Sequence, residues 1–250
     1  MGRQQRRTTP HSFPPVAVPV DASLRGRLIR RYKRFLVDIV TEDGRELTVH
    51  CPDPGSMHGC LREGASVRCS LSNNPRRKLR YSLEMIRVGR IWVGVNTARA
   101  NSVVSRALEM GVVPELAGYG EIRREVAAGD RSRLDFRLSH HPQDPRPAWL
   151  EVKSVTLADG RKGLFPDSVS ERATRHLETL MRLKQRGERA VLLFLVQRAD
   201  CDSVSPAAEI DPVYTEALRR AESRGVELFA LGARVTARAI TVERRLPVLA

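Results

Sequence analysis

The fold is decided by the stretch from Ser132 to Val155, which contains the runs SRLDFRL (132–138) and WLEVKSV (149–155). In the first run apolar residues alternate with charged ones, which is the period-two pattern of a strand with one apolar face. The second run is more apolar. Residues 139–148 between the runs include three prolines, which break regular structure and favour a surface turn. The stretch therefore predicts an antiparallel hairpin.

This hairpin brings three ionisable side chains together. Residues of equal parity on paired strands face the same side, so in-register pairing places Asp135 opposite Glu151 or Lys153, with the other one diagonal. Opposed Cβ atoms lie about 5 Å apart, close enough for the Asp135 and Glu151 carboxylates to share Mg²⁺ or Mn²⁺. With Lys153 orienting a water or stabilising developing charge, such a site is suited to phosphodiester hydrolysis.

A simpler interpretation of the same residues is a cross-strand ion pair of Lys153 with Asp135 or Glu151 on a solvated face. The neighbours of Glu151 and Lys153 argue against it, because Trp149, Leu150, Val152 and Val155 predict burial. Buried charge is costly without a partner or a function. Both interpretations stay open on spacing alone.

Several longer motifs resemble a known family. An aspartate followed by Glu-x-Lys on the next strand resembles the PD-(D/E)xK restriction-endonuclease-like superfamily. Six sequence motifs resemble the sugar fermentation stimulation protein family, and the resemblance covers about residues 22–250. The motifs are NNPRRKL (73–79), VGVNT (93–97), RREV (123–126), SRLDF (132–136), LEVKSVTL (150–157) and FPDSVSER (165–172).

This resemblance implies an N-terminal OB-like barrel followed by a restriction-endonuclease-like α/β domain. It also implies DNA binding and, for some members, a regulatory role in sugar metabolism. Arg172 and His176 lie four residues apart on an expected helix, and the resemblance favours a shared phosphate contact over a solvated edge. The turn-rich loop 51–60 has Asp53-Pro54-Gly55 where the family usually has Asn-Thr-Gly, so no ligand contact is transferred to it.

Composition limits the class of protein. No apolar run approaches the ~20 residues of a membrane span, which predicts a soluble protein. Residues 1–100 hold 19 basic and 8 acidic side chains, against 24 and 21 in residues 101–250. This asymmetric positive field favours a polyanionic partner, above all duplex DNA, with RNA or an anionic membrane surface as alternatives. The sequence does not determine the oligomeric state.

The four cysteines predict free thiols in a cytoplasmic protein, since no secretory signal precedes them. A zinc site is disfavoured because no pair of cysteines has the close spacing of structural zinc modules.

The first half of the chain predicts a basic arm and a barrel. Residues 1–21 suggest a flexible basic arm. Residues 22–97 contain about five short strands, at 35–40, 47–49, 66–71, 79–88 and 91–95, a count that fits an OB-type barrel. Basic side chains expected to lie between these strands are candidate nucleic-acid contacts, with a solvated face as the alternative for any single one: Arg30, Arg31, Lys33, Arg34, Arg76, Arg77, Lys78 and Arg80. The neighbouring Tyr32, Phe35 and Tyr81 could stack on bases or fill the barrel.

The second domain is expected over 98–250. Helices are predicted at 101–110, 168–186 and from Asp211-Pro212 to Gly225, and strands at 122–126, in the hairpin, and at 190–196, 226–231 and 234–242. Because 190–196 is continuously apolar, it should be central in the sheet.

Two functions follow that do not exclude each other. The first is a DNA-binding protein of low sequence specificity with a nuclease-like metal site. The second is an active Mg²⁺-dependent nuclease acting on DNA or RNA through Asp135, Glu151 and Lys153.

Overall fold

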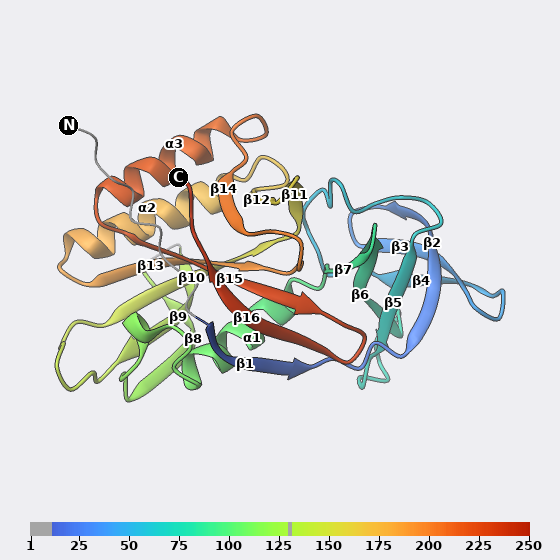
Figure 1. Cartoon of the computed structure of the whole chain (residues 1–250), viewed down its shortest axis with the longest axis horizontal. Helices are drawn as coiled ribbons and strands as arrows, with labels where there is room; N and C mark the ends of the chain where they lie inside the picture. Colours follow the sequence, from blue (N-terminus) through green and yellow to red (C-terminus); the bar gives the residue numbers. More distant parts are fainter. Residues whose placement is uncertain (1–11, 130–131) are drawn as a thin grey trace.

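The computed structural model describes residues 12–129 and 132–250, which form two domains side by side (Figure 1). A β-barrel lies at the right of Figure 1, and a larger α/β domain with a seven-stranded sheet lies at the left. At their junction the backbone N–H of Gly94 donates to the carbonyl of Gln197 at 2.9 Å. A Cβ on Gly94 would lie 2.8 Å from the side-chain oxygen of Gln197. Glycine at this position therefore permits the close approach of the two domains.

The barrel is closed by five strands. In sheet order these are β4 (Glu46–His50), β3 (Leu36–Thr41), β2 (Leu24–Tyr32), β5 (Ser66–Leu71) and β6 (Tyr81–Val88). Pairing of His50 with Ser82 joins β4 to β6 and completes the closure, while β7 (Ile91–Gly94) extends the sheet beyond β6. Inward-facing residues such as Val37, Ile39 and Val49 fill the interior. The predicted OB-like barrel is confirmed.

One part of the barrel differs from the expectation. The basic stretch from Arg25 to Arg34 was expected to lie between strands, but most of it is strand β2 itself. Its alternation explains this, because Gly26 and Leu28 are buried while Arg25 and Arg27 are exposed. The arginines mask the strand pattern, since long charged side chains can occupy every outward position of a barrel strand without disturbing its core.

The second domain is built on a mixed sheet. Its strands, in order, are β1 (Ser12–Pro19), β16 (Ala239–Leu246), β15 (Glu227–Val235), β13 (Arg189–Val196), β10 (Ala148–Val155), β9 (Arg133–Ser139) and β8 (Glu121–Ala127). Strand β13 is central and parallel to β10 and β15, as its continuous apolar sequence predicted. The predicted hairpin is the antiparallel pair β9–β10.

Helices cover both faces of this sheet. Helix α1 (Ala98–Glu109) packs on one face, and α2 (Glu171–Gln185) and α3 (Pro212–Ser223) pack on the other. Asp211 caps α3 by accepting from the backbone N–H of Tyr214 at 2.9 Å. A 3-10 turn (Pro114–Leu116) precedes β8. A small separate sheet is formed by β11 (Leu157–Asp159), β12 (Lys162–Phe165) and β14 (Ser203–Pro206).

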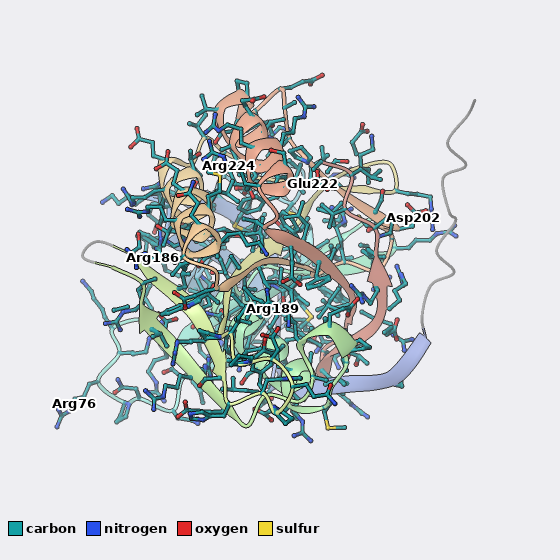
Figure 2. All side chains as sticks on the ribbon, turned by 90° about the vertical axis from the view of Figure 1, so that its left-hand side faces the viewer. Arg76, Arg186, Arg189, Asp202, Glu222 and Arg224 are labelled. Carbon is teal, nitrogen blue, oxygen red and sulfur yellow. The ribbon has the colours of Figure 1, made fainter. Side chains whose placement is uncertain are left out.

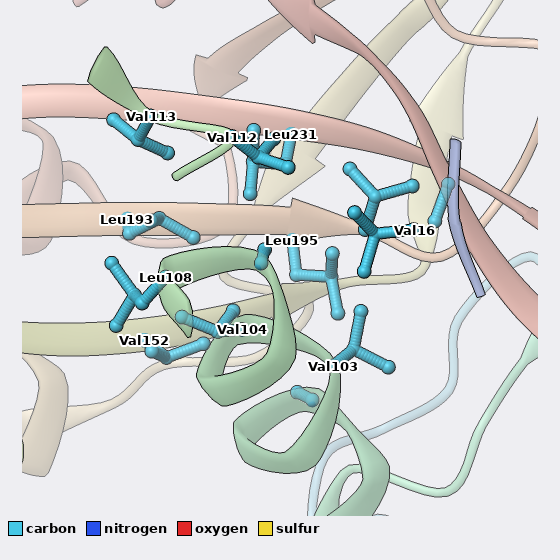
Figure 3. Packing of buried hydrophobic residues seen from close by; sticks show 14 of the residues in the cluster. Val16, Val103, Val104, Leu108, Val112, Val113, Val152, Leu193, Leu195 and Leu231 are labelled. Atoms are coloured by element: carbon cyan, nitrogen blue, oxygen red, sulfur yellow. The ribbon is translucent and has the colours of Figure 1, made fainter. Parts of the chain in front are cut away.

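The central strand contributes to two cores. Leu193 and Leu195 pack with Val104 and Leu108 of α1 (Figure 3), and the alternate residues Leu192 and Phe194 face α2 and α3. Both sides of β13 are therefore buried, which is why its sequence shows no alternation.

Residues 12–19 are not part of a flexible arm. Strand β1 pairs antiparallel with β16, where Val16 lies opposite Val242 and Val18 opposite Ile240. Val16 is 4 % exposed and joins the core around α1 (Figure 3). The expectation of an arm over 1–21 is thus wrong for 12–19, because the proline-rich composition conceals an edge strand, where proline is tolerated. Residues 1–11 of the expected arm lie outside the described residues.

A charge at Val16 tests this edge strand. We expect Val16→Asp to lower the free energy of unfolding by about 3 kcal/mol or more, because the carboxylate would be buried without a partner. Urea unfolding followed by circular dichroism measures the effect. The control Val213→Asp, at a valine 67 % exposed on α3, should change stability by less than about 0.5 kcal/mol. Equal stability of the two variants would contradict the packing of β1.

Two further expectations concern cysteines and membranes. Cys51, Cys60, Cys69 and Cys201 are all unpaired and buried. Within residues 12–129 and 132–250, no helix is long and apolar enough to cross a bilayer.

Candidate metal and nucleic-acid site

The predicted ionisable cluster lies in a cleft between the two domains. The cleft has a volume of about 460 Å³. The barrel contributes Arg34 and the loop residues 53–55, and the α/β domain contributes the rest of the lining. The lining residues that bear charge include Arg34, Asp53, Asp135, Glu151, Lys153 and Arg172. Both domains are therefore needed to build this cleft.

The register of the hairpin brings the two carboxylates together. Strands β9 and β10 pair Ala148 with Leu138, Trp149 with Arg137 and Leu150 with Phe136. One further step in this register places Asp135 opposite Glu151. The paired residues end at Leu150 and Phe136, and continuation of their register favours the pairing in which the two carboxylates are opposed, with Lys153 two residues along β10.

Two donors orient the Asp135 carboxylate. Its Oδ1 accepts from Nδ2 of Asn101 and its Oδ2 accepts from the backbone N–H of Val152, both at 2.7 Å. Burial, followed by the nearby charge of Glu151, raises the pKa of Asp135 to about 6 despite these hydrogen bonds. Asn101 lies in the first turn of α1, so the helix packed on the sheet also holds a site residue.

Glu151 is the most enclosed member of the cluster, at 4 % exposed. Its Oε1 accepts from Lys153 Nζ at 2.7 Å and also contacts Nδ1 of His176. Burial alone would raise the pKa of Glu151, but the charge of Lys153 and the contact with His176 outweigh it and hold the pKa below its usual value. Lys153 and Glu151 therefore form an ion pair, but both lie on strand β10 rather than across two strands, and the pair is buried rather than solvated.

The other oxygen of Glu151 supports a cation site. Among the described residues, Oε2 is a buried atom with no hydrogen-bond partner. A buried, unpaired carboxylate oxygen is costly, and a hard divalent cation is the ligand that it suits best. No set of three His, Cys, Asp or Glu residues is close enough to hold a metal within the described ranges. Asp135 and Glu151 would thus be the protein ligands, with water or substrate oxygens completing the coordination shell.

The loop after β4 links the barrel to the cleft. Arg31 donates to the carbonyls of Asp53 and Gly55, at 2.9 and 2.8 Å, and also to that of Ser56. From the other domain, Asp167 accepts from the backbone N–H of Met57 at 2.7 Å. A Cβ on Gly55 would lie 2.4 Å from Asp167 Oδ1, so this contact requires glycine. The loop that sequence reasoning left out therefore forms one wall of the cleft.

Asp53 in this wall gives a prediction about pH. Burial raises the pKa of Asp53 to about 6, although the N–H of Gly55 donates to its Oδ1 at 2.8 Å. The unfolded pKa is about 3.9, so the folded state retains a proton that the unfolded state releases, and this residue lowers stability as pH rises from about 4 to 6. Asparagine keeps the acceptor and removes the charge. We expect Asp53→Asn to be more stable than the original protein by about 1–3 kcal/mol at pH 7.5 and nearly equal at pH 4.

Urea unfolding at the two pH values measures this difference. The control is Asp43→Asn, an exposed carboxylate in the same domain whose pKa is lowered, chiefly by a hydrogen bond from Thr41. Its replacement should change stability at pH 7.5 in the opposite direction. A destabilised Asp53→Asn at pH 7.5 would contradict the assignment of a buried, costly charge.

The predicted nucleic-acid contacts separate into two groups. Arg30 pairs with Asp38 at 2.9 Å and Arg31 holds the cleft loop, so both guanidinium groups are engaged within the protein. His176 is 4 % exposed against Glu151, and its expected phosphate contact is replaced by a contact with the carboxylate. Arg77 donates to Ser82 Oγ at 3.1 Å and is half-buried. Arg30 is nevertheless exposed to solvent, as are the remaining members of the set: Lys33, Arg34, Arg76, Lys78, Arg80 and Arg172.

These exposed residues do not form one cluster. Arg34 and Arg172 lie at the cleft, whereas Arg76 projects at the outer edge of the molecule (Figure 2). Sequence reasoning missed Asn101 as a contact of Asp135 and misjudged His176, because neither role has a local signal. Only the packing of α1 and α2 on the sheet brings these side chains to the carboxylates.

Comparison with known proteins identifies the family. The family "Sugar fermentation stimulation protein RE domain" matches residues 98–239, and "SfsA N-terminal OB domain" matches residues 29–95. The chain belongs to the sugar fermentation stimulation protein family. The resemblance found in the sequence motifs is therefore confirmed, as is the order of an OB barrel followed by a nuclease-like domain.

Relatives in this family match over nearly their full length. The sugar fermentation stimulation protein homolog of Geobacter sulfurreducens is 48 % identical over 90 % of this chain and 95 % of its own length. That of Pseudomonas putida (strain GB-1) is 47 % identical over 95 % of this chain and 98 % of its own. The solved structure of SfsA from Pyrococcus furiosus in complex with Ca²⁺ has a TM-score of 0.84 at 25 % identity, covering 92 % of this chain and 98 % of that chain.

Proposed function

We propose that this protein is a divalent-metal-dependent nuclease of low sequence specificity, in which Asp135 and Glu151 bind the cation and Lys153 assists hydrolysis. The observation that carries the proposal is the buried Oε2 of Glu151, which has no partner among the described residues although Lys153 and His176 satisfy Oε1. An unpaired carboxylate oxygen on a residue that lines a polar cleft supports a bound cation at this position.

The side chains of the cleft have separate tasks in this proposal. A bound Mg²⁺ or Mn²⁺ would polarise the scissile phosphoryl group and lower the pKa of a water. Asn101 and the N–H of Val152 fix the orientation of Asp135. Lys153, held 2.7 Å from Glu151 Oε1, donates toward the attacking water or the developing negative charge. The Nδ1 of His176 contacts the Oε1 of Glu151 and so helps to fix that carboxylate. Arg172 at the cleft offers a guanidinium group to the phosphate.

Cation identity is supported by the chemistry of the ligands. Carboxylate oxygens favour hard cations, and the relative from Pyrococcus furiosus is in complex with Ca²⁺. Ca²⁺ takes similar ligands at longer distances. Mg²⁺ is commonly bound by one or two carboxylates, with waters and substrate oxygens in the remaining positions, so we propose Mg²⁺ or Mn²⁺ for this two-carboxylate site.

In this proposal, nucleic acid binds to an arginine-rich surface of the barrel domain. The exposed residues Arg76, Lys78 and Arg80 are free to bind phosphates, which gives affinity with little sequence preference. The formal net charge of +14 supports a polyanionic partner, and duplex DNA remains the partner we propose for this outer surface. A cytoplasmic location, in which the four buried thiols stay reduced, fits such a partner.

The test combines metal binding with cleavage. Calorimetry of the metal-free protein should detect a divalent cation bound at about one site per chain, and supercoiled plasmid or an RNA should be nicked with Mg²⁺ or Mn²⁺ and not with EDTA. A protein that binds neither cation, or that cuts equally well with EDTA, is not the nuclease proposed here.

A second candidate is DNA binding without catalysis, used to regulate genes of sugar metabolism. The family's name supports the link to sugar metabolism. Comparison of transcripts between a strain lacking the gene and one carrying a cleavage-dead form would separate this role from hydrolysis.

A further inference from the structure

The barrel presents one aromatic side chain that its own core does not use. Phe35 is 43 % exposed and is the single aromatic residue among the large exposed hydrophobic side chains of the described chain. It precedes β3 in the turn after β2, and it is absent from the core cluster that fills the barrel. The exposed ring offers apolar area that a stacked ligand could cover.

Other aromatic rings of the barrel are already occupied. Tyr32 donates to Asp38 and has Arg30 above its ring at 5.0 Å. The ring of Trp92 is covered by Arg68 and Arg87, and Tyr81 packs against the barrel core. Of the three aromatics that the sequence marked as possible stacking residues, Phe35 alone has a ring available to a ligand.

Phe35 is accompanied by a second flat ring. His50 at the end of β4 lies nearly parallel to it, with an interplanar angle of 11° and 6.4 Å between ring centroids. Burial and the charge of Arg77 lower the pKa of His50, which favours the neutral imidazole. Its Nδ1 is buried and has no hydrogen-bond partner among the described residues. A neutral, parallel pair of rings is a suitable surface for a nucleobase.

The position of this pair connects the basic loop with the cleft. On one side, pairing of His50 with Ser82 and the approach of Arg77 place the pair beside loop 72–80. On the other side, Arg34 is the chain neighbour of Phe35 and lines the cleft. The carbonyl of Phe35 also accepts from the N–H of Cys51 at 2.8 Å, at the start of the loop that forms the cleft wall. The rings thus lie between the phosphate-binding surface and the carboxylates.

The cleft itself is narrow for a double helix. Its volume of about 460 Å³ falls in the range of small-molecule sites, roughly 300–1,000 Å³, which suits a nucleotide or two. Glu151 and Lys153, at 4 % and 9 % exposed, lie at its base. A phosphate reaches such groups when its strand is free to bend away from a partner, as in enzymes that act on extruded or unpaired nucleotides.

We propose that Phe35 and His50 form a base-stacking platform that directs an unpaired nucleic-acid strand, DNA or RNA, into the cleft. This inference rests on the proposed function, because it names the form of polymer that the nuclease site receives. Duplex DNA would be held by the outer basic surface, and its frayed or single-stranded end would pass over the platform.

Binding without catalysis tests the platform. In EDTA, the affinity of full-length protein is measured by fluorescence anisotropy for labelled oligothymidine DNA, oligouridine RNA and a duplex of equal length. Phe35→Ala should weaken binding of at least one single strand about tenfold, the effect of losing one stacked base, and change duplex binding by less than about twofold. The single strand that loses affinity identifies the sugar that the site accepts. Met110→Ala, at a residue 53 % exposed on the end of α1, is the matched control and should change none.

A second variant distinguishes loss of stacking from misfolding of Phe35→Ala. Phe35→Trp should keep single-strand affinity, and its added tryptophan fluorescence, relative to the original protein, should be quenched by the strand and not by the duplex. Equal losses for strand and duplex in Phe35→Ala, no loss for either single strand, or no quenching would overturn the platform. These results do not depend on cleavage, so a protein that binds no metal would refute the nuclease proposal and leave the stacking result standing.

Discussion

Asp135→Asn should reduce metal-dependent cleavage at least about a hundredfold and leave nucleic-acid affinity within about twofold. The substitution keeps the shape of the side chain but removes one of two carboxylates that would share the cation, and such electrostatic contributions are worth several kcal/mol in the transition state. Asparagine also offers a single acceptor to the two donors that now orient Asp135, Asn101 and the N–H of Val152. Both changes act on the metal rather than on the phosphate-binding surface.

Nicking of supercoiled plasmid and calorimetry of the cation are the two measurements for this variant. The control is Asp144→Asn, a half-buried carboxylate that pairs with Arg146 at 2.7 Å and does not line the cleft. It should keep full activity. Cleavage that persists in Asp135→Asn would assign the activity to another site or to a contaminant. Loss of both cleavage and nucleic-acid binding would indicate that the fold, and not the metal, had been disturbed.

Replacement of Arg76, Lys78 and Arg80 by glutamine should weaken duplex binding by about a hundredfold at low salt. Each phosphate contact contributes about 0.9 to the slope of log affinity against log salt, so three lost contacts should lower the magnitude of that slope by about 3. Arg76 and Lys78 are exposed, and Figure 2 places Arg76 at the outer edge of the molecule. The change in slope separates lost phosphate contacts from a general loss of folding.

A matched triple replacement is available on α3. Arg219, Arg220 and Arg224 are exposed to solvent, and Arg224 lies in a different region from Arg76 (Figure 2). Their replacement by glutamine removes the same charge from the protein and should alter the salt slope by less than 1. Equal effects of the two triple variants would mean that net charge, and not the surface of loop 72–80, holds the nucleic acid.

Local patterns were sufficient to predict the hairpin and its neighbours. The alternation in 132–138 and the apolar run in 190–196 predicted β9 and β13, because side-chain periodicity reports which faces of a strand are buried. The same reasoning failed for β1 and β2. Prolines in the first and arginines in the second suggested irregular structure. The partner of β1 is β16 at the other end of the chain, and β2 pairs with both β3 and β5.

The set of residues that lines the cleft could not be predicted from the sequence and became known only from the folded structure. Asn101 comes from α1, His176 from α2 and the Asp53 wall from the barrel, and no spacing in the sequence connects these segments. Arg31 is a clear example, since its sequence context among other arginines suggested phosphate binding but its guanidinium group holds three loop carbonyls. The role of an arginine depends on which acceptors lie within reach, and those acceptors are set by tertiary contacts.

The sequence by itself determined the two-domain order, the family and the gathering of Asp135, Glu151 and Lys153 on one hairpin, because each depends on local periodicity, on sequence motifs or on the parity of paired strands. Only the tertiary structure decided that Glu151 keeps one oxygen unpaired and that the barrel forms one wall of the cleft. It also decided that the side chain of Phe35 is exposed to solvent. These features depend on which surfaces remain uncovered after packing. Packing is a property of segments that meet in space, and the linear order of residues does not encode it directly.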